Sequence, residues 1–399
     1  MEQLKPMQLT KRNEVTNIDD KKPKTKRPRK LWKRLVKWSL LTVLVLLVLW
    51  GFITYWTSTN DCARYSLAPA NPMKAIVYCD YGVSNLKFQD IEKPTPADDQ
   101  LLVRVHAVSV NPLDWHFIEG TPYIGRFLFG FGARKPKDTQ LGVDFSGTVE
   151  AVGKNVTKYK PGDEVFGGRT GAFAQYVCVR ESRGVALKPA NISFEQAASV
   201  PIAAITALQA LRDTGHVQAG QKVLINGASG GVGTFAVQLA KSYGADVTGV
   251  CSTRNLDLVR SIGAEHVVDY TKEDFSKDGQ RYDLILDNVG TQPLSQFRRA
   301  LQPKGQCVMI GGGGANDGRF IGPMARIITA LLVSPFVSQK FGMMFAQLNH
   351  DDLAFLADLM QSGKVTPVVD RTYKLGDLPD AIRYLEQGHA RGKVVVAVE

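Results

Sequence analysis

The sequence predicts an α/β protein with a doubly wound parallel sheet, a second, β-rich domain, and one transmembrane helix ahead of both. Three observations lead to this prediction. Residues 39–57 carry no charge and are mostly apolar. Short strand-like segments bounded by Gly and Pro follow from Met73. From Ile202 onward, helical and strand-like segments alternate, as they do in a parallel sheet covered by helices. The 399 residues suffice for two domains with sizeable cores.

The positive charge is concentrated ahead of the apolar run. Residues 1–38 hold 13 Lys and Arg against 4 Asp and Glu, a net +9 out of the +11 of the whole chain, so only +2 remains for the rest. We predict that residues 1–38 form a basic disordered tail. The nearly neutral remainder argues against a nucleic-acid-binding face, which requires clustered basic residues.

The apolar run, residues 39–57, is predicted to be a transmembrane helix. At about 1.5 Å per residue it nearly spans a bilayer core, and aromatic residues such as Trp38 and Trp56 flank it. A buried helix of a soluble protein is one alternative. A cleavable signal peptide is another, but the small-residue site Ala68-Pro69-Ala70 lies far beyond the run. We favour an uncleaved anchor followed by a linker, residues 58–72.

The five cysteines are scattered, and no pair has the C-x-x-C spacing of a structural zinc site or a thioredoxin motif. This odd, sparse set argues against a disulfide framework. Four of them lie in apolar strand-like runs and are predicted to be small buried residues: Cys79, Cys178, Cys251 and Cys307.

One stretch organises the helix–strand part of the chain, Gln221–Lys241. A strand, Val223–Ile225, leads into a glycine turn and then into a helix, Thr234–Lys241, and a second strand, Asp246–Cys251, follows. Small residues occupy the three positions of a G-x-G-x-x-G fingerprint: Ala228, Gly230 and Gly233. They allow a tight turn, close approach of a pyrophosphate, and close packing of helix on strand. The helix N-terminus then faces the phosphates, which predicts dinucleotide binding.

The end of the second strand indicates which dinucleotide is bound. NAD-binding proteins usually place an Asp or Glu there to bind the ribose 2′-hydroxyl. This chain has Cys251-Ser252-Thr253-Arg254 instead. A hydroxyl and a guanidinium suit a 2′-phosphate, so the sequence favours NADP(H). The alternative is that Arg254 is simply a solvated residue at the start of a helix.

From Met73 to Glu399 the chain resembles the medium-chain dehydrogenase/reductase family, in particular its zinc-free quinone oxidoreductase (zeta-crystallin-like) branch. The motifs that carry the resemblance appear in family order: Asn111-Pro112-Leu113-Asp114, LGVDFSGTVEAVG from Leu141, KPGDEVFG from Lys160, SFEQAASVPIAAITALQAL from Ser193, INGASGGVG from Ile225, Asp269-Tyr270-Thr271, DLILDNVG from Asp283, and GKVVV from Gly392. Residues 1–72 lie outside the family pattern.

The resemblance implies a GroES-like catalytic domain, residues 73–197 and 346–399, interrupted by a Rossmann domain, residues 198–345, with NADP(H) in the cleft between them. It assigns the pyrophosphate to Ser229, Gly230, Gly231, Val232 and Gly233, and the 2′-phosphate to Ser252, Arg254 and Tyr270. It places Thr206, Asn288 and Gly311 around the nicotinamide, and Lys393 near the cofactor.

The resemblance also implies that no metal is bound. Zinc-dependent relatives have a Cys where this chain reads Asn111 and a His where it reads Val143. Without a thiolate and an imidazole there is no ligand set for a zinc that activates an alkoxide. We therefore predict hydride transfer from NADPH to an acceptor that conjugation already activates, a quinone or an α,β-unsaturated carbonyl.

The acceptor oxygen needs a hydrogen-bond donor as charge develops, and Asn111 is our candidate. His116 and Tyr123 are candidate proton donors, and Asp114 is predicted to orient the loop. Each candidate also has a purely structural explanation. Asn before Pro often forms turns, and a single His or Tyr is more often an ordinary surface or core residue. Enoyl or alkenal reduction, an alcohol dehydrogenase-type activity, and a membrane-tethered NADPH-binding scaffold or redox sensor with little turnover are the alternative functions.

Two further features stay open in the sequence. The stretch Phe320–Phe345 is apolar, with only Arg326 and Lys340 as charges. We predict a packed helix pair that forms the substrate-side wall or a homodimer contact, or else a surface open to the bilayer. The orientation is also open, because the positive-inside rule keeps the basic tail in the cytoplasm, yet reduced nicotinamide cofactor is expected there too.

Overall fold

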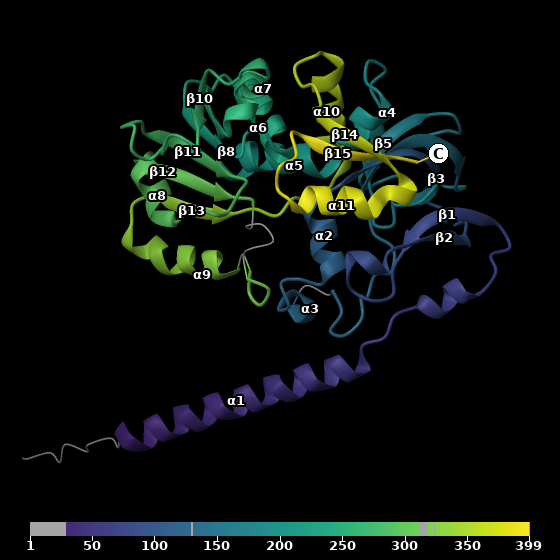
Figure 1. Ribbon diagram of the computed structural model, residues 1–399, viewed down its shortest axis with the longest axis horizontal. Helices are drawn as coiled ribbons and strands as arrows, with labels where there is room; N and C mark the ends of the chain where they lie inside the picture. Colours follow the sequence, from purple (N-terminus) through teal and green to yellow (C-terminus); the bar gives the residue numbers. More distant parts are fainter. Residues whose placement is uncertain (1–28, 129–130, 312–317, 323, 399) are drawn as a thin grey trace, which may run out of the picture. The chain divides into compact units, whose positions relative to one another are not determined.

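The computed structural model describes residues 29–128, 131–311, 318–322 and 324–398 (Figure 1). It divides into two units, Met1–Ile53 and a body, Thr54–Glu399. Helix α1 (Arg29–Thr57) starts ahead of the predicted membrane segment, so the basic residues next to the apolar run are helical rather than part of a tail. Residues 1–28 of the predicted tail lie outside the described residues. The helix is long and apolar enough to cross a membrane, features that a signal sequence shares.

The first sheet of the body has six parallel strands in the order β10-β9-β8-β11-β12-β13. The chain starts in the middle of the sheet and winds outward to both edges, which is the order of a dinucleotide-binding sheet. The predicted Rossmann fold is therefore confirmed. The strands are β8 (Lys222–Asn226), β9 (Asp246–Cys251), β10 (His266–Asp269), β11 (Tyr282–Asp287), β12 (Leu301–Met309) and β13 (Lys340–Met343).

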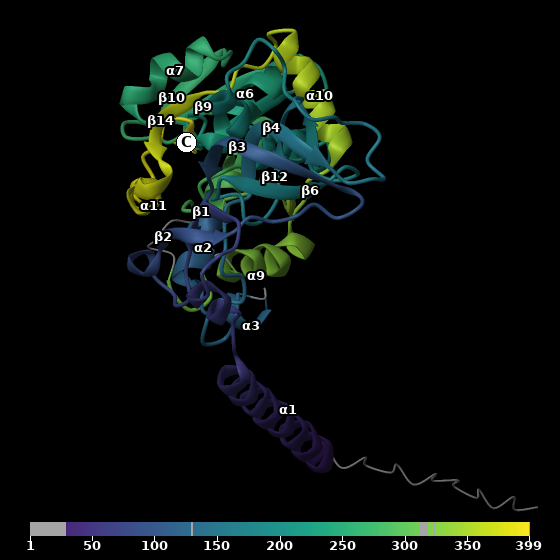
Figure 2. The same ribbon diagram turned by 90° about the vertical axis from the view of Figure 1, so that its right-hand side faces the viewer.

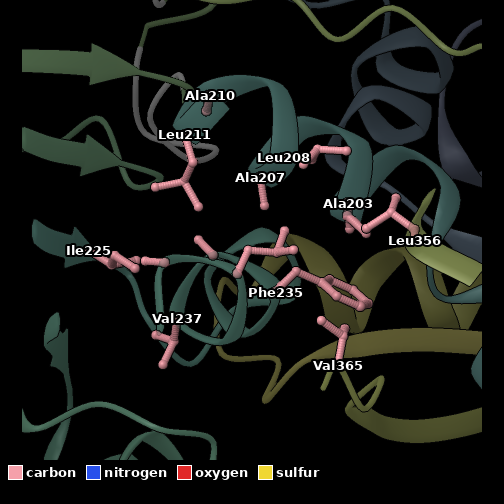
Figure 3. Packing of buried hydrophobic residues seen from close by; sticks show 14 of the residues in the cluster. Ala203, Ala207, Leu208, Ala210, Leu211, Ile225, Phe235, Val237, Leu356 and Val365 are labelled. Atoms are coloured by element: carbon pink, nitrogen blue, oxygen red, sulfur yellow. The ribbon is translucent and has the colours of Figure 1, made fainter. Parts of the chain in front are cut away.

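Helices cover both faces of this sheet because its strands send apolar side chains to alternate sides. Val223 and Ile225 of β8 belong to one buried cluster, with α5 and α6, and Leu224 between them belongs to another, with α8 and α9. Figure 3 shows Leu208 of α5 and Phe235 of α6 in the first cluster. The helices are α5 (Pro201–Gln209), α6 (Gly231–Ser242), α7 (Leu256–Ser261), α8 (Leu294–Ala300) and α9 (Met324–Val333).

The second sheet has seven strands and takes one pair from the end of the chain. Its order is β14-β15-β3-β4-β5-β7, with β6 pairing with β3, and all pairs but β14–β15 are antiparallel. Because β15 pairs with β3, the C-terminal segment returns to the first domain. The strands are β3 (Gln100–Val110), β4 (Asp144–Val152), β5 (Glu164–Gly168), β6 (Tyr176–Arg180), β7 (Val185–Leu187), β14 (Val369–Lys374) and β15 (Lys393–Ala397).

Shorter elements complete the body. A separate antiparallel pair consists of β1 and β2. The remaining strands and helices are β1 (Pro72–Val77), β2 (Lys87–Glu92), α2 (Pro112–Glu119), α3 (Gly125–Leu128), α4 (Phe194–Ala198), α10 (His350–Gln361) and α11 (Leu378–Glu386). The 3₁₀ and π turns are η1 (Cys62–Ser66), η2 (Val83–Asn85), η3 (Ala210–Thr214), η4 (Thr253–Asn255), η5 (Ser334–Phe336) and η6 (Leu375–Asp377).

The stretch Phe320–Phe345 differs from the predicted helix pair. It forms one helix, α9, then the turn η5, and then strand β13, which pairs in parallel with β12 at the sheet edge. The apolar residues near the end of the stretch therefore belong to a strand and not to a second helix. Their short run carries no periodicity that separates an edge strand from a helix.

The sequence predicts no disulfide, but the structure contains one among the described residues. Cys62 and Cys79 form a disulfide, with their Cα atoms 5.9 Å apart, so Cys79 is not a free buried thiol. The bond joins η1 to the segment after β1, a contact that no cysteine spacing signals. Cys251 and Cys307 are buried as predicted, whereas Cys178 is half-buried.

Candidate active site

The turn between β8 and α6 has the backbone that a bound pyrophosphate requires. Gly227 takes the left-handed conformation, with φ 77°, so the tight turn lies one position before Ala228. A Cβ on Gly233 would collide with the backbone of Gly227 and Ala228, so only glycine lets the helix pack this closely. Gly230 is the N-cap of α6, and a Cβ there would make only an ordinary van der Waals contact, 3.5 Å from Gly227 O. The predicted pyrophosphate residues all lie in this turn or at the start of α6: Ser229, Gly230, Gly231, Val232 and Gly233.

The predicted 2′-phosphate residues lie where β9 and β10 end. Tyr270 N donates to Cys251 O at 3.1 Å, which brings the start of the segment after β10 beside Ser252. Arg254 follows in the turn η4 and is exposed. Its Nη2 donates to His389 O at 2.6 Å, so the guanidinium reaches the C-terminal segment. A hydroxyl, a phenol and a guanidinium in this place suit an anionic group.

Asn255 is a site residue that sequence reasoning missed. Its buried side chain donates from Nδ2 to Ser229 Oγ at 3.0 Å and to Ser252 Oγ at 3.1 Å, and so joins the pyrophosphate turn to the 2′-phosphate segment. Its Oδ1 is buried and has no hydrogen-bond partner among the described residues. From the sequence, Asn at this position looks like an ordinary helix N-cap, yet its side chain makes no capping hydrogen bond.

Two of the predicted nicotinamide residues, Asn288 and Gly311, lie just after the ends of β11 and β12. Asn288 Nδ2 donates to Asn226 O at 3.0 Å, and its Oδ1 is buried without a hydrogen-bond partner in the described part of the chain. A Cβ on Gly311 would collide with Asn288 O, so only glycine at position 311 lets these two segments come this close. Thr206 is buried on α5. The unpaired acceptor on Asn288 fits the amide N–H of a nicotinamide carboxamide.

A buried polar network is centred on Asp144 at the start of β4. Its Oδ2 accepts from Ser109 Oγ and from Asn111 Nδ2, both at 2.9 Å, and Lys393 Nζ lies 3.3 Å away. Its Oδ1 accepts from Ile202 N at 3.0 Å, at the start of α5. Asp144 is fully buried and Lys393 is 4% exposed. Every charge in this network is therefore compensated, as burial requires.

Lys393 joins this network to the cofactor turn. Its Nζ donates to Asn111 Oδ1 at 2.6 Å. A Cβ on Gly231 would lie 2.9 Å from Lys393 Cδ, so the aliphatic stem passes along the turn. The preceding residue, Gly392, donates its N–H to Ser229 O at 2.8 Å. The structure thus links Lys393, predicted to lie near the cofactor, with Asn111, predicted to act in catalysis.

Asn111 is also held by the start of α2. Its backbone N–H donates to Asp114 Oδ2 at 2.8 Å, and the two side chains form a capping box. Asp114 therefore orients the loop, as predicted. Burial raises the pKa of its carboxyl to about 7. Asn111 Oδ1 accepts a hydrogen bond from Lys393, which fixes the orientation of the amide. Its Nδ2 has two N–H donors, and Asp144 accepts from one of them, which leaves the second for a ligand.

Comparisons with known proteins identify the family. A zinc-binding dehydrogenase model matches residues 262–396, and an alcohol dehydrogenase GroES-like domain model matches residues 97–190. The 2-methylene-furan-3-one reductase of Solanum lycopersicum is 34% identical over 350 residues, which are 83% of this chain and 80% of that protein. The chain belongs to the medium-chain dehydrogenase/reductase family.

Two further matches agree with this membership. The chloroplastic NADPH-dependent alkenal/one oxidoreductase of Arabidopsis thaliana is 36% identical over 341 residues, covering 81% of this chain and 79% of that protein. The solved quinone oxidoreductase from Coxiella burnetii has a TM-score of 0.70 and 32% identity, and the match covers 82% of this chain and all of that one. The predicted fold, a GroES-like domain with a Rossmann domain, is therefore confirmed.

Zinc, which the name of one family model implies, does not fit this medium-chain dehydrogenase/reductase. Lys393 places an ammonium 3.3 Å from Asp144 and 2.6 Å from Asn111, at the positions where a cation would need ligands. An amide held by that ammonium is not a zinc ligand of the usual thiolate, imidazole or carboxylate type. Among the described residues, no group of three or more His, Cys, Asp or Glu could hold a metal ion.

His116 and Tyr123, the candidate proton donors, lie at the end of α2 and in the loop after it. His116 Nδ1 donates to Thr121 O at 2.9 Å, which ties the helix to that loop. Tyr123 N donates to Arg319 O at 2.7 Å, and Arg126 lies over the Tyr123 ring. The structure thus brings Asn111 and Lys393 together, and it places His116 on α2 and Tyr123 in the loop that follows α2.

The high pKa of Asp114 predicts a pH dependence of stability. Folding raises this pKa from 3.8 to about 7, so the folded state holds a proton that the unfolded state has lost between these values. The stability that Asp114 contributes should fall as pH rises from about 4 to about 7, by roughly 4 kcal/mol at most. Asp114→Asn removes this dependence and keeps an oxygen for the Asn111 N–H. We would measure the free energy of urea unfolding of the variant and of the parent at pH 5 and at pH 7.5. The difference, variant minus parent, should be more positive at pH 7.5 than at pH 5. Parallel pH curves would contradict the assignment.

Proposed function

We propose that this protein is an NADPH-dependent reductase of quinones or α,β-unsaturated carbonyls. The bound cofactor supplies the hydride from its C4 position. The observation that supports the proposal is the reach of Lys393 from the glycine turn to Asn111, because it brings a hydrogen-bond donor close to the turn proposed to hold the cofactor. The names of the relatives support the acceptor class, since they include an alkenal/one oxidoreductase and a furanone reductase.

Each predicted site residue would have one of four roles: binding the pyrophosphate, binding the 2′-phosphate, positioning the nicotinamide, or assisting the reaction at the acceptor. The five residues of the turn, Ser229, Gly230, Gly231, Val232 and Gly233, bind the pyrophosphate, and Ser252, Arg254 and Tyr270 bind the 2′-phosphate. Thr206, Asn288 and Gly311 position the nicotinamide. Asn111 offers its second Nδ2 hydrogen to the acceptor oxygen as negative charge develops there. His116 or Tyr123 supplies the proton.

Of the two acceptor classes in this proposal, alkenals and enones are the one that the names of these two relatives favour over quinones. Their reduction shares with quinone reduction the donor on the carbonyl oxygen and differs in needing a proton at the α-carbon. Turnover assays on a quinone and on an enone of equal size separate the two. NADPH binding without turnover of either would favour a scaffold or redox-sensor role instead.

The cofactor preference gives the decisive test. Arg254→Ala removes a charge-assisted hydrogen bond to the 2′-phosphate, so the KM for NADPH should rise by roughly 10- to 100-fold while that for NADH stays unchanged. Arg260→Ala is the matched control, because Arg260 is also exposed and near the end of β9 but pairs with Asp257. Initial rates with each cofactor provide the measurement. Equal effects on NADPH and NADH would refute the role of Arg254.

We further propose that residues 39–57 stay in the mature protein as a single membrane anchor. The helix has the required length and composition. The competing explanation is a targeting segment that is removed, since the Arabidopsis relative is named chloroplastic. The intact mass of the protein extracted from membranes distinguishes a retained anchor from a cleaved one.

A further inference from the structure

The segment after α1 is fastened to the body rather than free. Asn60 Nδ2 donates to Cys79 O at 2.9 Å, and the disulfide joins Cys62 to Cys79. Asp61 Oδ1 accepts from Thr139 Oγ1 at 2.8 Å. Cys62 follows Thr57 by five residues, which span about 17 Å when fully extended. The end of the apolar helix therefore cannot lie far from this part of the body.

Basic side chains surround this attachment. Ser58 Oγ accepts from the backbone N–H groups of Arg134 and Lys135, at 3.2 and 3.3 Å. Arg134 and Lys137 are exposed in the same loop, and Arg319 is exposed in the segment before α9. Such residues are attracted to anionic lipid headgroups.

Helix α9, which follows Arg319 in the chain, presents an apolar stripe. One side of the helix faces the sheet, where Ala330 is buried and Arg326 pairs with Asp287. Ile328 and Leu332, four residues apart on α9, lie on the other side and are 51% and 67% exposed. Phe336, in the turn η5 that follows the helix, is 87% exposed. The apolar stripe therefore consists of Ile328 and Leu332 on one face of α9, followed by Phe336 in η5.

Two backbone hydrogen bonds connect the segment before α9 with the loop after α2. Tyr123 N donates to Arg319 O at 2.7 Å and Ile124 N to Phe320 O at 3.1 Å. Figures 1 and 2 show α3 and α9 at the same end of the body, with α10 at the other end. Phe320 is 71% exposed. The exposed Phe320 therefore lies beside the loop that holds Tyr123, one of the two candidate proton donors.

We propose that this end of the body rests on the lipid bilayer, and that acceptors enter the active site from the membrane. The proposal rests on the proposed function for the identity of the reaction. A bilayer is the occupant that fits, because the fastened segment holds the end of the apolar helix close by and because basic residues border the apolar ones. The preferred acceptors are then quinones or enones with long apolar tails.

The disulfide also indicates the side of the membrane. Disulfides persist in oxidising compartments and are rare in the cytosol. Basic residues ahead of a membrane helix favour the cytoplasm for the N-terminus. Both place the body on the non-cytosolic side. A membrane-permeant maleimide added before lysis should leave Cys62 and Cys79 unmodified until a reductant is added. Their modification without reductant would overturn this assignment.

The docking test uses the full chain in vesicles of phosphatidylcholine with about one third phosphatidylglycerol, which supply an anionic surface. A fluorophore is attached at Phe336→Cys or, as control, at Phe355→Cys on α10, with Cys178→Ser in both. Phe355 is also an exposed phenylalanine. Doxyl-labelled lipid should quench the probe at position 336 and leave the one at 355 unaffected. Equal quenching at both positions, or burial of position 336 in a dimer without quenching, would overturn the proposal.

The entry test compares two quinones that differ only in their isoprenoid tail. Leu332→Asp with Phe336→Asp should lower kcat/KM for the tailed quinone about tenfold, a loss of apolar contact worth about 1.4 kcal/mol, and leave the tailless quinone unchanged. Phe355→Asp should change neither. Equal losses on both quinones would refute membrane entry. Absence of turnover by the unaltered protein would refute the proposed function alone, since lipid quenching reports docking without chemistry.

Discussion

Replacing Lys393 with methionine should lower kcat for NADPH-dependent quinone reduction by about 100-fold or more, while NADPH binding changes little. The lysine acts through Asn111, so it is a positioning residue. Its Nζ holds Asn111 Oδ1 at 2.6 Å and thereby turns Nδ2 toward Asp144 and the acceptor. Without the ammonium, only the hydrogen bond from Nδ2 to Asp144 still orients the amide, and removal of one well-placed donor typically costs about 10²- to 10³-fold in kcat.

The readout must separate this effect from lost stability, because Lys393→Met also leaves Asp144 buried without its ammonium partner. Lys188→Met is the matched control. Lys188 is a second buried lysine with a carboxylate partner, Glu164, in the same domain. The control should lower the unfolding midpoint without changing kcat.

A double-mutant cycle completes the test. If Lys393 acts only through Asn111, the variant with both Asn111→Ala and Lys393→Met should be no slower than Asn111→Ala alone. Multiplicative losses would instead mean that the ammonium contacts the substrate or cofactor directly. Stopped-flow oxidation of NADPH and fluorescence titration of NADPH binding supply kcat and Kd separately.

The elements that sequence predicts well are those whose pattern is local. The run Lys222–Cys251 contains its own strand, turn, helix and second strand, so glycine spacing and apolar periodicity suffice. The start of α2 is similar, because Asn111 and Asp114 interact three residues apart.

The parts that sequence could not predict depend on contacts between distant segments. Lys393 reaches Asn111 across 282 residues, and nothing near either of them indicates the pairing. Cys62 meets Cys79 only because η1 docks on the body. Asn255 looks like a helix cap until Ser229 is brought beside it. Motif resemblance placed Lys393 near the cofactor, but its role toward Asn111 required the fold.

Replacing Arg326 with methionine should lower the free energy of unfolding by about 3–5 kcal/mol, the usual cost of removing one partner of a buried ion pair. Arg326 Nη2 lies 2.5 Å from Asp287 Oδ2, and Asp287 is fully buried at the end of β11. Nε and Nη1 of Arg326 are buried with no hydrogen-bond partner among the described residues. The guanidinium is therefore held mainly by this one carboxylate and by the ring of Phe297.

The same carboxylate holds the backbone of the segment that we predict to contact the nicotinamide, so we expect its loss of pairing to affect cofactor binding. Asp287 Oδ1 accepts from the N–H groups of Val289 and Gly290, both at 3.2 Å. We expect weaker NADPH binding together with the lower urea midpoint. Adding Asp287→Asn to Arg326→Met should recover part of the stability, because no unpaired charge then remains in the core. Arg299→Met, at an exposed arginine on α8, is the control and should stay within about 0.5 kcal/mol of the parent. If Arg326→Met costs no more than this control, α9 is not anchored through Asp287, and its apolar stripe is held in place by packing alone.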